Sequence, residues 1–488
     1  MKDFYRKGYK ALLHLEIAPA ACKTLKTRMK HYNYSNDEIE NAVLCADITS
    51  DGIIEEIDSR IHEKVDLIIG GPPCQAFSSA GRAQSPDSMN SDPRNYLFEN
   101  YLQILNHIRP KMFIFENVKG ILSAKPKGVR IFDTIVREMG KTYNIVDDPT
   151  ILLLNAADYG VPQIRKRVII IGIRKDINYI DIKDVYADII KTHSDIDDRL
   201  PNYITVGEAI LDLPKLNPGE GVEKQDILKT RKMNDYLKRI SSPTCPIYNH
   251  VARKHNDLDR ERYRILSANK NWQLKDLQKI RPDLIHHDPK HFGNRYTVQE
   301  SNKPGKTVVA HLYKDGNLFI HPDSEQARTF TVREAARIQS FPDDFVFEGS
   351  RTEQYRQVGN AVPPLMAEAF ATTLGKYLDI IEEKEKEMNK NSILLLGPAG
   401  TGKTYYAKQI AHGHKSLLIF LNNNSSYENL INGIEIITSG GTILYEERKK
   451  AILNFLLEAK ANNSEEYYLI LDDINRVDLN DILGEVIY

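Results

Sequence analysis

Short apolar runs alternate with amphipathic segments through residues 1–175, and this alternation limits the possible fold more than any other feature. The strand-like runs are residues 12–15, 65–69, 112–115 and 167–172. Between the second and third runs, apolar side chains recur at helical spacing over residues 95–108. Strands joined by such a helix form a parallel crossover unit, so the sequence predicts an α/β fold with a doubly wound sheet.

The composition is that of an ordinary globular protein. The chain has 488 residues, enough for two or more domains, with 41% hydrophobic and 27% charged residues. Its four cysteines, Cys22, Cys45, Cys74 and Cys245, are widely scattered, which indicates a reducing compartment and no zinc site. No apolar run approaches the roughly 20 residues that span a bilayer, so we expect a cytoplasmic protein without a membrane partner.

One of these cysteines lies on a stiff loop. Residues 70–78 read Gly-Gly-Pro-Pro-Cys-Gln-Ala-Phe-Ser and follow the apolar run 65–69, at the edge where open α/β sheets place their chemistry. Gly70 and Gly71 allow a close backbone approach, and two prolines stiffen the loop before Cys74. This arrangement suggests a nucleophile. A lone cysteine is more often a small buried hydrophobe, so Cys74 by itself does not establish a catalytic site.

Other polar side chains occupy comparable places. Glu116 follows the run 112–115 directly, which puts a carboxylate at a strand end on the same rim as Cys74. The run Gln-Ile-Arg-Lys-Arg at 163–167 precedes another strand, and alternation sends Arg165 and Arg167 to one face. The loop Gly-Asn-Ala-Val-Pro-Pro at 359–364 stands before a helix.

Over about the first 377 residues these motifs resemble those of the DNA cytosine-5 methyltransferases. The resemblance rests on the Pro-Cys-Gln loop, Glu-Asn-Val, Gln-x-Arg-x-Arg, the stretch Arg-Glu-Ala-Ala-Arg-Ile-Gln-Ser-Phe-Pro-Asp at 333–343, and Gly-Asn-Ala-Val-Pro-Pro. Each motif alone is weak to moderate evidence. Five motifs in the family's order make a chance resemblance very improbable.

The resemblance implies a role for each candidate catalytic residue. Cys74 would add to carbon 6 of cytosine, which makes carbon 5 reactive toward a methyl donor. Glu116 would bind ring nitrogen 3, Arg165 would contact the base, and Arg167 would orient the loop or a phosphate. The substrate would be double-stranded DNA, because carbon 5 lies within the base stack and its cytosine must be flipped out.

It also implies S-adenosylmethionine as the methyl donor. Glu16 would bind the ribose hydroxyls and Asp47 the adenine amino group, while Asn360 and Val362 would close over the methionine end. For Asp47, helix N-capping before Ile48 is the competing explanation. The family's first strand and glycine-rich loop have no counterpart here, so we expect a sequence truncated at its start, with weak or absent S-adenosylmethionine binding.

The predicted domain order is a Rossmann-like methyltransferase with an insertion, followed by part of a motor domain. We expect a methyltransferase catalytic domain at 1–178 (first strand missing), a target-recognition domain at 179–302, a return to the methyltransferase at 303–377, a charged linker at 378–390, and a partial P-loop AAA+ domain at 391–488. Residues 223–295 hold 17 Lys and Arg against 9 Asp and Glu. This excess suits contact with phosphates, although a solvated basic surface explains it equally well.

The carboxyl-terminal part contains a nucleotide-binding motif. A strand expected at 393–396 runs into Gly-Pro-Ala-Gly-Thr-Gly-Lys-Thr at 397–404, the Gly-x-x-x-x-Gly-Lys-Thr loop whose amides cradle phosphates. Gly397 and Gly402 shape this loop, Lys403 would reach the terminal phosphates, and Thr404 would hold Mg²⁺.

A second strand, near 468–471, ends in two acids. Asp472 would also hold the Mg²⁺ of GTP or ATP, and Asp473 would polarise the attacking water. This part resembles the AAA+ GTPase of McrB-type restriction systems. The family usually has glutamate at the position of Asp473, and the sensor and arginine-finger parts are missing, so we do not expect hydrolysis by this chain alone.

Our main hypothesis is a DNA (cytosine-5) methyltransferase of a restriction-modification system, acting beside a restriction nuclease subunit. The alternative is a nucleotide-driven, DNA-binding restriction subunit whose methyltransferase part only recognises DNA. The Cys74, Glu116 and Arg165 set favours the enzyme, whereas the missing glycine-rich loop favours the alternative.

Overall fold

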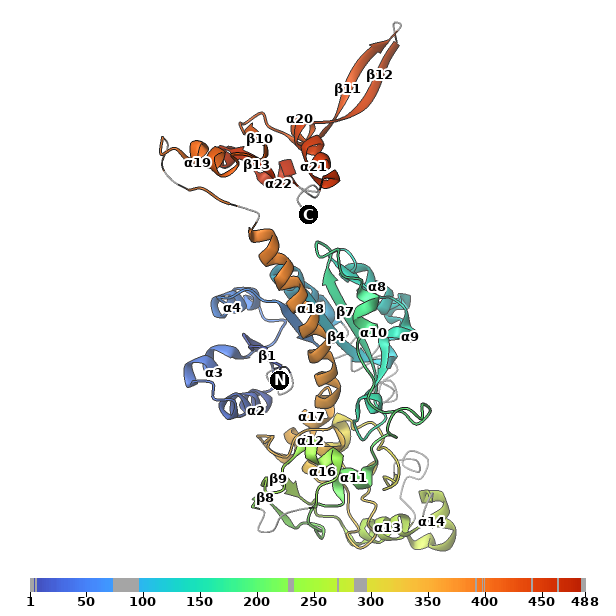
Figure 1. Ribbon diagram of the computed structural model, residues 1–488. Coiled ribbons are helices and arrows are strands. Elements are labelled where there is room, and N and C mark those ends of the chain that lie inside the picture. Colours follow the sequence, from blue (N-terminus) through green and yellow to red (C-terminus); the bar gives the residue numbers. More distant parts are fainter. Residues whose placement is uncertain are drawn as a thin grey trace. The chain divides into compact units, whose positions relative to one another are not determined.

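The computed structural model contains two compact units, Met1–Ile381 and Glu382–Tyr488 (Figure 1). It describes residues 4, 7–72, 96–226, 232–269, 272–284, 296–390, 393–396, 398, 400–439, 442–462 and 465–483. Two of the predicted site residues, Cys74 and Gly397, lie outside the described residues. Within the part of the chain that is described, every helix is too short or too polar to cross a membrane.

The main sheet of the first unit has the strand order β3-β4-β7-β5, and β6 also pairs with β7. The strands are β3 (Leu67–Gly70), β4 (Met112–Val118), β5 (Tyr143–Ile145), β6 (Leu153–Asn155) and β7 (Lys166–Arg174). β3 runs parallel to β4, as the crossover prediction requires, and the connecting helix forms as α7 (Leu97–Ile108). β7 is antiparallel to β4, β5 and β6, so the sheet is mixed.

A second, two-stranded parallel sheet pairs β1 (His14–Glu16) with β2 (Val43–Cys45). Each strand has three residues, and β1 includes His14 and Glu16. Leu13 and Leu15 pack with Leu44 of β2 and with Ile104 and Ile108 of α7. The sheet is thereby attached to the helix that also covers the main sheet.

The largest hydrophobic core surrounds β4 and β7. Phe113 and Phe115 in β4, and Ile169 and Ile171 in β7, are fully buried, because both faces of these strands are covered.

The helices of the first unit are α2 (Pro19–His31), α3 (Asn36–Ala42), α4 (Ile53–Arg60), α7, α8 (Ile131–Met139), α9 (Pro149–Leu152), α10 (Ile182–Ala187), α11 (Val206–Ile210), α12 (Asp235–Ile240), α13 (Asp257–Ala268), α14 (Leu274–Ile280), α16 (Val332–Ile338), α17 (Arg351–Asn360) and α18 (Pro364–Lys390).

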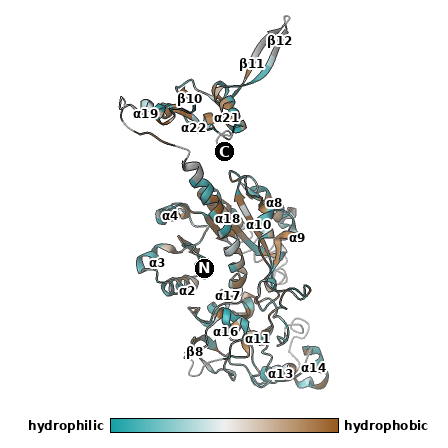
Figure 2. Ribbon diagram, in the orientation of Figure 1, coloured by the Kyte–Doolittle hydropathy of each residue, from teal (hydrophilic) through white to brown (hydrophobic). Residues whose placement is uncertain are grey.

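α18 is one continuous helix that passes through the expected linker. Its earlier turns bury apolar side chains such as Met366, Leu374 and Ile381, whereas its later turns are charged and hydrophilic (Figure 2). The division between the two units falls after Ile381, within this helix. The charged run therefore forms a helical extension of a packed helix, as expected for a helical linker.

The expected target-recognition region belongs to the first unit. It contains an antiparallel hairpin, β8 (Gly221–Gln225) with β9 (Ile247–Val251), and helices α10 to α14. Tyr236, Leu237 and Ile247 join the large core, whereas Tyr263 and Leu266 belong to a smaller cluster of their own. The region is thus partly merged with the core of the unit and partly built around a satellite core.

The second unit contains a two-stranded parallel sheet and a hairpin. Its elements are α19 (Lys403–Ile410), β10 (Lys415–Phe420), α20 (Tyr427–Leu430), β11 (Asn432–Ser439), β12 (Thr442–Lys449), α21 (Ala451–Ala461), β13 (Tyr467–Asp472) and α22 (Leu479–Leu483). β10 pairs with β13 in parallel, and β11 pairs with β12 in the antiparallel sense.

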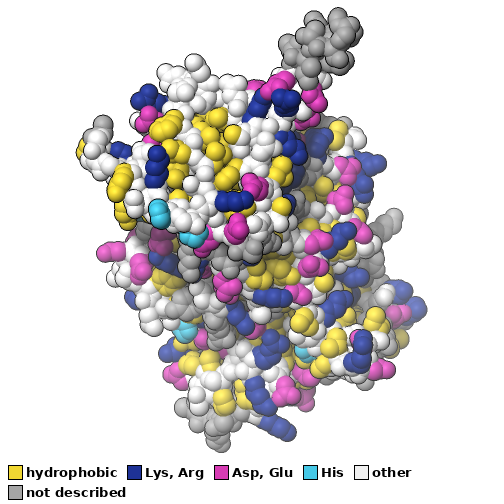
Figure 3. All heavy atoms as spheres, turned by 45° about the horizontal axis from the view of Figure 1, so that its top comes forward, with side chains coloured by type: hydrophobic (Ala, Val, Ile, Leu, Met, Phe, Trp, Pro, Cys, Tyr) yellow, Lys and Arg dark blue, Asp and Glu magenta, His cyan; other side chains and the backbone are white. Residues whose placement is uncertain are grey.

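The strand predicted at 393–396 is wrong for this structure. These residues are irregular, because the described β10 and β13 pair with each other and neither takes this segment as a neighbour. Ile393, Leu394 and Leu396 are consequently 61%, 62% and 83% exposed. Hydrophobic side chains also gather on the face of the second unit that Figure 3 presents.

Candidate functional site

Glu116 and Arg167 form an ion pair at the end of the main sheet. Nε of Arg167 lies 2.9 Å from Oε1 of Glu116, and the two side chains are only 13% and 15% exposed. Burial lowers the pKa of Arg167, and the adjacent carboxylate opposes that shift, so the guanidinium stays charged. The site thus holds one shielded carboxylate together with its own cation.

The loop that leads to Cys74 begins beside this pair. Gly71 stands next to Glu116, and a Cβ atom at Gly71 would lie 2.9 Å from Oε2 of Glu116, so glycine leaves room for the carboxylate. Nδ2 of Asn117 donates to the carbonyl of Pro72 at 3.2 Å. Asn117 therefore fixes the last described residue of the loop, two positions before Cys74, on the rim that carries Glu116.

Arg165, which the sequence predicts to contact the base, is buried against backbone carbonyls. Its side chain is 1% exposed and donates to three backbone carbonyls, those of Val308 at 2.7 Å, Gly359 at 3.1 Å and Ala361 at 3.0 Å. Burial, with the nearby charge of Arg167, lowers the pKa of Arg165 to about 9. Arg167 therefore contacts Glu116, whereas Arg165 binds the backbone at Val308, Gly359 and Ala361.

The loop that Arg165 holds contains Asn360 and Val362. Asn360 is the last residue of α17 and is exposed, whereas Val362, in the connection to α18, is half-buried. At Gly359 a Cβ atom would lie 2.4 Å from the backbone nitrogen of Ala310, so only glycine permits this approach of α17 to the segment after Val308. The loop is therefore fixed on two sides by backbone contacts.

Glu16 and Asp47 lie at the carboxyl ends of neighbouring parallel strands. Glu16 pairs with Cys45 in register, and the carbonyl of Glu16 accepts from the nitrogen of Ala46 at 3.1 Å. Oε1 of Glu16 accepts from the nitrogen of Ala18. Two carboxylates at adjacent strand ends are suitable acceptors for hydroxyl and amino groups of a small ligand.

The competing explanation for Asp47, an N-cap of a helix at Ile48, is wrong, because Asp47 caps a turn instead. Oδ1 of Asp47 accepts from the backbone nitrogen of Thr49 at 2.9 Å and from its hydroxyl at 2.8 Å, which lowers the pKa of Asp47. These bonds cap a turn at residues 47–50, ahead of α4, rather than a helix that starts at Ile48. One carboxylate oxygen of Asp47 is thus occupied by its own turn.

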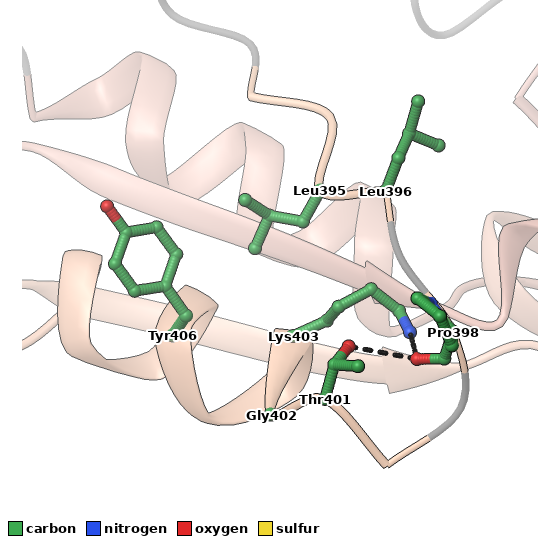
Figure 4. Close-up of a pocket in the computed structure, with 7 residues that line it drawn as sticks. All are labelled: Leu395, Leu396, Pro398, Thr401, Gly402, Lys403 and Tyr406. Carbon is green, nitrogen blue, oxygen red and sulfur yellow. Dashed lines mark hydrogen bonds between the residues drawn. The ribbon is translucent and has the colours of Figure 1, made fainter.

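The second unit has a cavity of about 430 Å³ at its glycine-rich loop (Figure 4). It is lined by Leu395, Leu396, Pro398, Thr401, Gly402, Lys403 and Tyr406. Gly400 and Gly402 have φ angles of +78° and +79°, which L side chains rarely adopt, so this loop requires glycine at both positions. Nζ of Lys403 and Oγ1 of Thr401 both donate to the carbonyl of Pro398.

The two predicted acids of this unit lie at the end of β13. Oγ1 of Thr404 donates to Oδ2 of Asp472 at 2.5 Å, so the hydroxyl and the carboxylate expected to share a Mg²⁺ ion are already adjacent. Asp473 follows in the left-handed region, with φ of +60°, and pairs with Arg476 at 3.1 Å. The lysine, the hydroxyl and the acids thus converge on one end of the sheet.

A family model described as C-5 cytosine-specific DNA methylase matches residues 3–376. The chain belongs to the C-5 cytosine-specific DNA methylase family. This confirms the resemblance inferred from the five motifs, and with it S-adenosylmethionine as the family's methyl donor. A second model, an AAA domain of the dynein-related subfamily, matches residues 392–487 of this methylase, which confirms the AAA domain at the carboxyl end.

Relatives of this methylase support the same conclusion. A protein named type II methyltransferase M.Bpa9945I, from Bacillus paralicheniformis, is 34% identical, and the match covers 76% of this chain and 94% of the relative. Type II methyltransferase M.DdeI from Desulfomicrobium norvegicum is 35% identical, with 78% and 86% covered. A crystal structure of an E. coli prophage protein, described as a DNA modification methyltransferase, is 25% identical, with a TM-score of 0.55 and coverage of 77% and 95%.

The structure of the methylase also reveals residues to which the sequence analysis assigned no role. Gln163 and Gln339 are buried and hydrogen-bond around the loop 359–364, and Asn117 holds Pro72. Gln163 and Gln339 belong to two of the recognised motifs, so their position was visible. Their partners were not, because these lie up to 176 residues away along the chain.

Proposed function

We propose that this chain methylates carbon 5 of a flipped-out cytosine in double-stranded DNA, with Cys74 as the nucleophile. The observation that carries the proposal is the shielded Glu116–Arg167 pair beside Pro72, two residues before Cys74. A carboxylate with its own cation, next to a proline-stiffened cysteine loop, is the donor and acceptor set that cytosine activation needs.

In the proposed reaction, the Cys74 thiolate adds to carbon 6 of the base and electron density moves to carbon 5. Glu116 holds the proton at ring nitrogen 3, and Arg167 stabilises the charge that develops on the ring. Bound S-adenosylmethionine would supply an electrophilic methyl group, and the S–CH3 bond would break as carbon 5 takes it up, which leaves S-adenosylhomocysteine. Loss of the carbon-5 proton to a base then expels Cys74, which restores the double bond between carbons 5 and 6.

The residues proposed for the methyl donor fit it in chemical kind. Glu16 and Asp47 present carboxylate oxygens at adjacent parallel strand ends, where ribose hydroxyls and an adenine amino group can donate. Asn360 and Val362 lie beside Gly359 and Ala361, whose carbonyls accept from Arg165. Arg165 is therefore proposed as a support of the loop 359–364, and Arg167 takes the place of the arginine that contacts the base.

For the second unit we propose binding of GTP or ATP with Mg²⁺. Lys403 and the loop 397–402 would bind the phosphates, and the adjacent Thr404 and Asp472 would hold the metal ion. The AAA match and the cavity at Lys403 support this part. We further propose a restriction nuclease subunit as the partner, since the relatives are type II methyltransferases and an AAA domain follows the methylase.

A covalent trapping experiment tests the methylation proposal. The full chain is incubated with duplex DNA that contains 5-fluorocytosine and with S-adenosylmethionine, because fluorine at carbon 5 prevents the final elimination. A denaturant-stable adduct is expected for the wild type and is expected to vanish in Cys74→Ala. DNA binding without any adduct, at saturating S-adenosylmethionine, would contradict the proposal and favour a subunit that only recognises DNA.

A further inference from the structure

The carbonyl of Ala361 is the meeting point of two buried side chains. It accepts from Nη2 of Arg165 at 3.0 Å and from Nε2 of Gln339 at 3.0 Å. Arg165 is 1% and Gln339 0% exposed. Ala361 stands between Asn360 and Val362, so these two bonds define where both neighbours lie.

The same side chains belong to a closed ring of hydrogen bonds. Oε1 of Gln339 accepts from Nε2 of Gln163, and Oε1 of Gln163 accepts from the backbone nitrogen of Val308 at 2.8 Å. The carbonyl of Val308 accepts in turn from Nη1 of Arg165 at 2.7 Å. The ring therefore runs from Gln163 through Gln339, Ala361, Arg165 and Val308 back to Gln163.

Every amide hydrogen of the two glutamines is used. Nε2 of Gln339 donates to the carbonyls of Val358 and Ala361, and Nε2 of Gln163 donates to the carbonyl of Ile338 and to Gln339. Reversing either amide would place an oxygen against carbonyl oxygens. Each glutamine consequently has one orientation, because both amide hydrogens and the amide oxygen that the ring uses have fixed partners.

We propose that Gln339 is a positioning residue for the methyl-donor site. It holds Ala361 from the side of α16, while Arg165 holds it from the start of β7, two residues before the Arg167 that pairs with Glu116. The ring therefore connects the Glu116–Arg167 pair, where the base is proposed to bind, to the loop with Asn360 and Val362. The proposal rests on the proposed function, in which this loop contacts S-adenosylmethionine.

The test compares Gln339→Leu with Gln354→Leu in the full chain. Gln354 is a matched control, because it is also buried and donates to one carbonyl, that of Gly349, at the other end of α17. The steady-state constants are measured for S-adenosylmethionine and for DNA. Amide hydrogen exchange of residues 359–365 is measured by mass spectrometry without any cofactor.

Gln339→Leu removes the bonds to the carbonyls of Val358 and Ala361, each worth about 0.5–1.5 kcal/mol, so the KM for S-adenosylmethionine is expected to rise about tenfold. The kcat at saturating donor and the KM for DNA are expected to stay within about twofold, and only this variant is expected to exchange faster at 359–365. Equal effects of both variants, or an equal rise of both KM values, would overturn the proposal.

Failure of the proposed function has a separate signature. If the wild type shows neither methyl transfer nor binding of S-adenosylmethionine, the proposed function fails, and the exchange measurement still decides whether Gln339 fixes the loop. Unchanged exchange in Gln339→Leu would then refute the positioning role. Faster exchange confined to 359–365 would support it.

Discussion

The guanidinium of Arg167 and the carboxylate of Glu116 meet across two antiparallel strands, with Nε 2.9 Å from Oε1. Glu116 is opposite Ile169 in the register of β4 and β7, so Arg167 is its diagonal neighbour on the same face. Arg165 and Arg167 are two residues apart, yet only Arg167 has this carboxylate within reach. The two arginines of this motif therefore have different partners, a carboxylate for Arg167 and backbone carbonyls for Arg165.

Removing the cation of this pair is expected to impair chemistry more than binding. In Arg167→Met, the largely buried carboxylate of Glu116 loses the cation that neutralises its charge. Methyl transfer is expected to fall about 10²- to 10³-fold, as for other lost transition-state donors, with little change in the KM for S-adenosylmethionine. Tritium transfer to DNA measures both. Arg199→Met is the control, because Arg199 is 88% exposed, and equal activity of the two variants would contradict the assignment.

Acid is expected to destabilise the first unit through buried histidines. Burial lowers the pKa of His321 to about 4. The charge of Glu334 opposes this shift, and the charge of Arg328 adds to it. The unfolded chain binds this proton near pH 6.5, so the stabilisation is complete above that pH and is lost as the pH falls toward 4. Burial lowers the pKa of His250 in the same direction.

The melting temperature between pH 7.5 and pH 4.5 checks this expectation. His321→Gln is expected to flatten the decline, since one proton of difference corresponds to about 1.4 kcal/mol per pH unit. Below about pH 4.3 the wild type and the variant are expected to lose further stability together. There Arg328 holds the pKa of Glu334 well below its usual range, despite burial. An unchanged slope in His321→Gln would show that other groups govern the acid response.

Nucleotide binding by the second unit is expected to depend on Lys403. Its Nζ now donates to the carbonyl of Pro398 and would turn to the phosphates of a bound nucleotide. Lys403→Ala is expected to weaken binding of fluorescent GTP and ATP analogues at least tenfold, whereas Lys408→Ala, in the same helix α19, is expected to change little. Asp472→Asn is expected to remove the effect of Mg²⁺. Equal affinities in the two lysine variants would exclude this site.

Tyr406 is expected to contribute to recognition of the base rather than of the phosphates. It lines the cavity on the side of Leu395 that is away from Pro398, whereas the adjacent Tyr405 is not part of the lining (Figure 4). Tyr406→Ala is expected to weaken binding of nucleoside triphosphates severalfold, because stacking of a base on an aromatic ring contributes about 1–3 kcal/mol. Inorganic tripolyphosphate, measured by competition, is expected to bind unchanged. Tyr405→Ala serves as the control, and a weaker tripolyphosphate interaction would contradict the assignment.

Much of the candidate site was predictable because it follows local rules. Local residues and backbone sterics place the carboxylates Glu116 and Asp472 at strand ends. They also require the glycines of the nucleotide loop. The prediction failed for the apolar run 393–396, which looks like a buried strand and is irregular. A strand needs partners for its backbone groups, and hydrophobicity alone does not supply them.

The sequence by itself determined the family, the order of the motifs and the identity of the chemical groups, because these depend on which residues stand at which spacing. Only the tertiary structure decided which arginine pairs with Glu116, and that Gln163, Gln339 and Arg165 surround Ala361. The physical reason is burial. A guanidinium or an amide inside the protein must find partners, and the carbonyls that Arg165 binds come from segments 143–196 residues further along the chain.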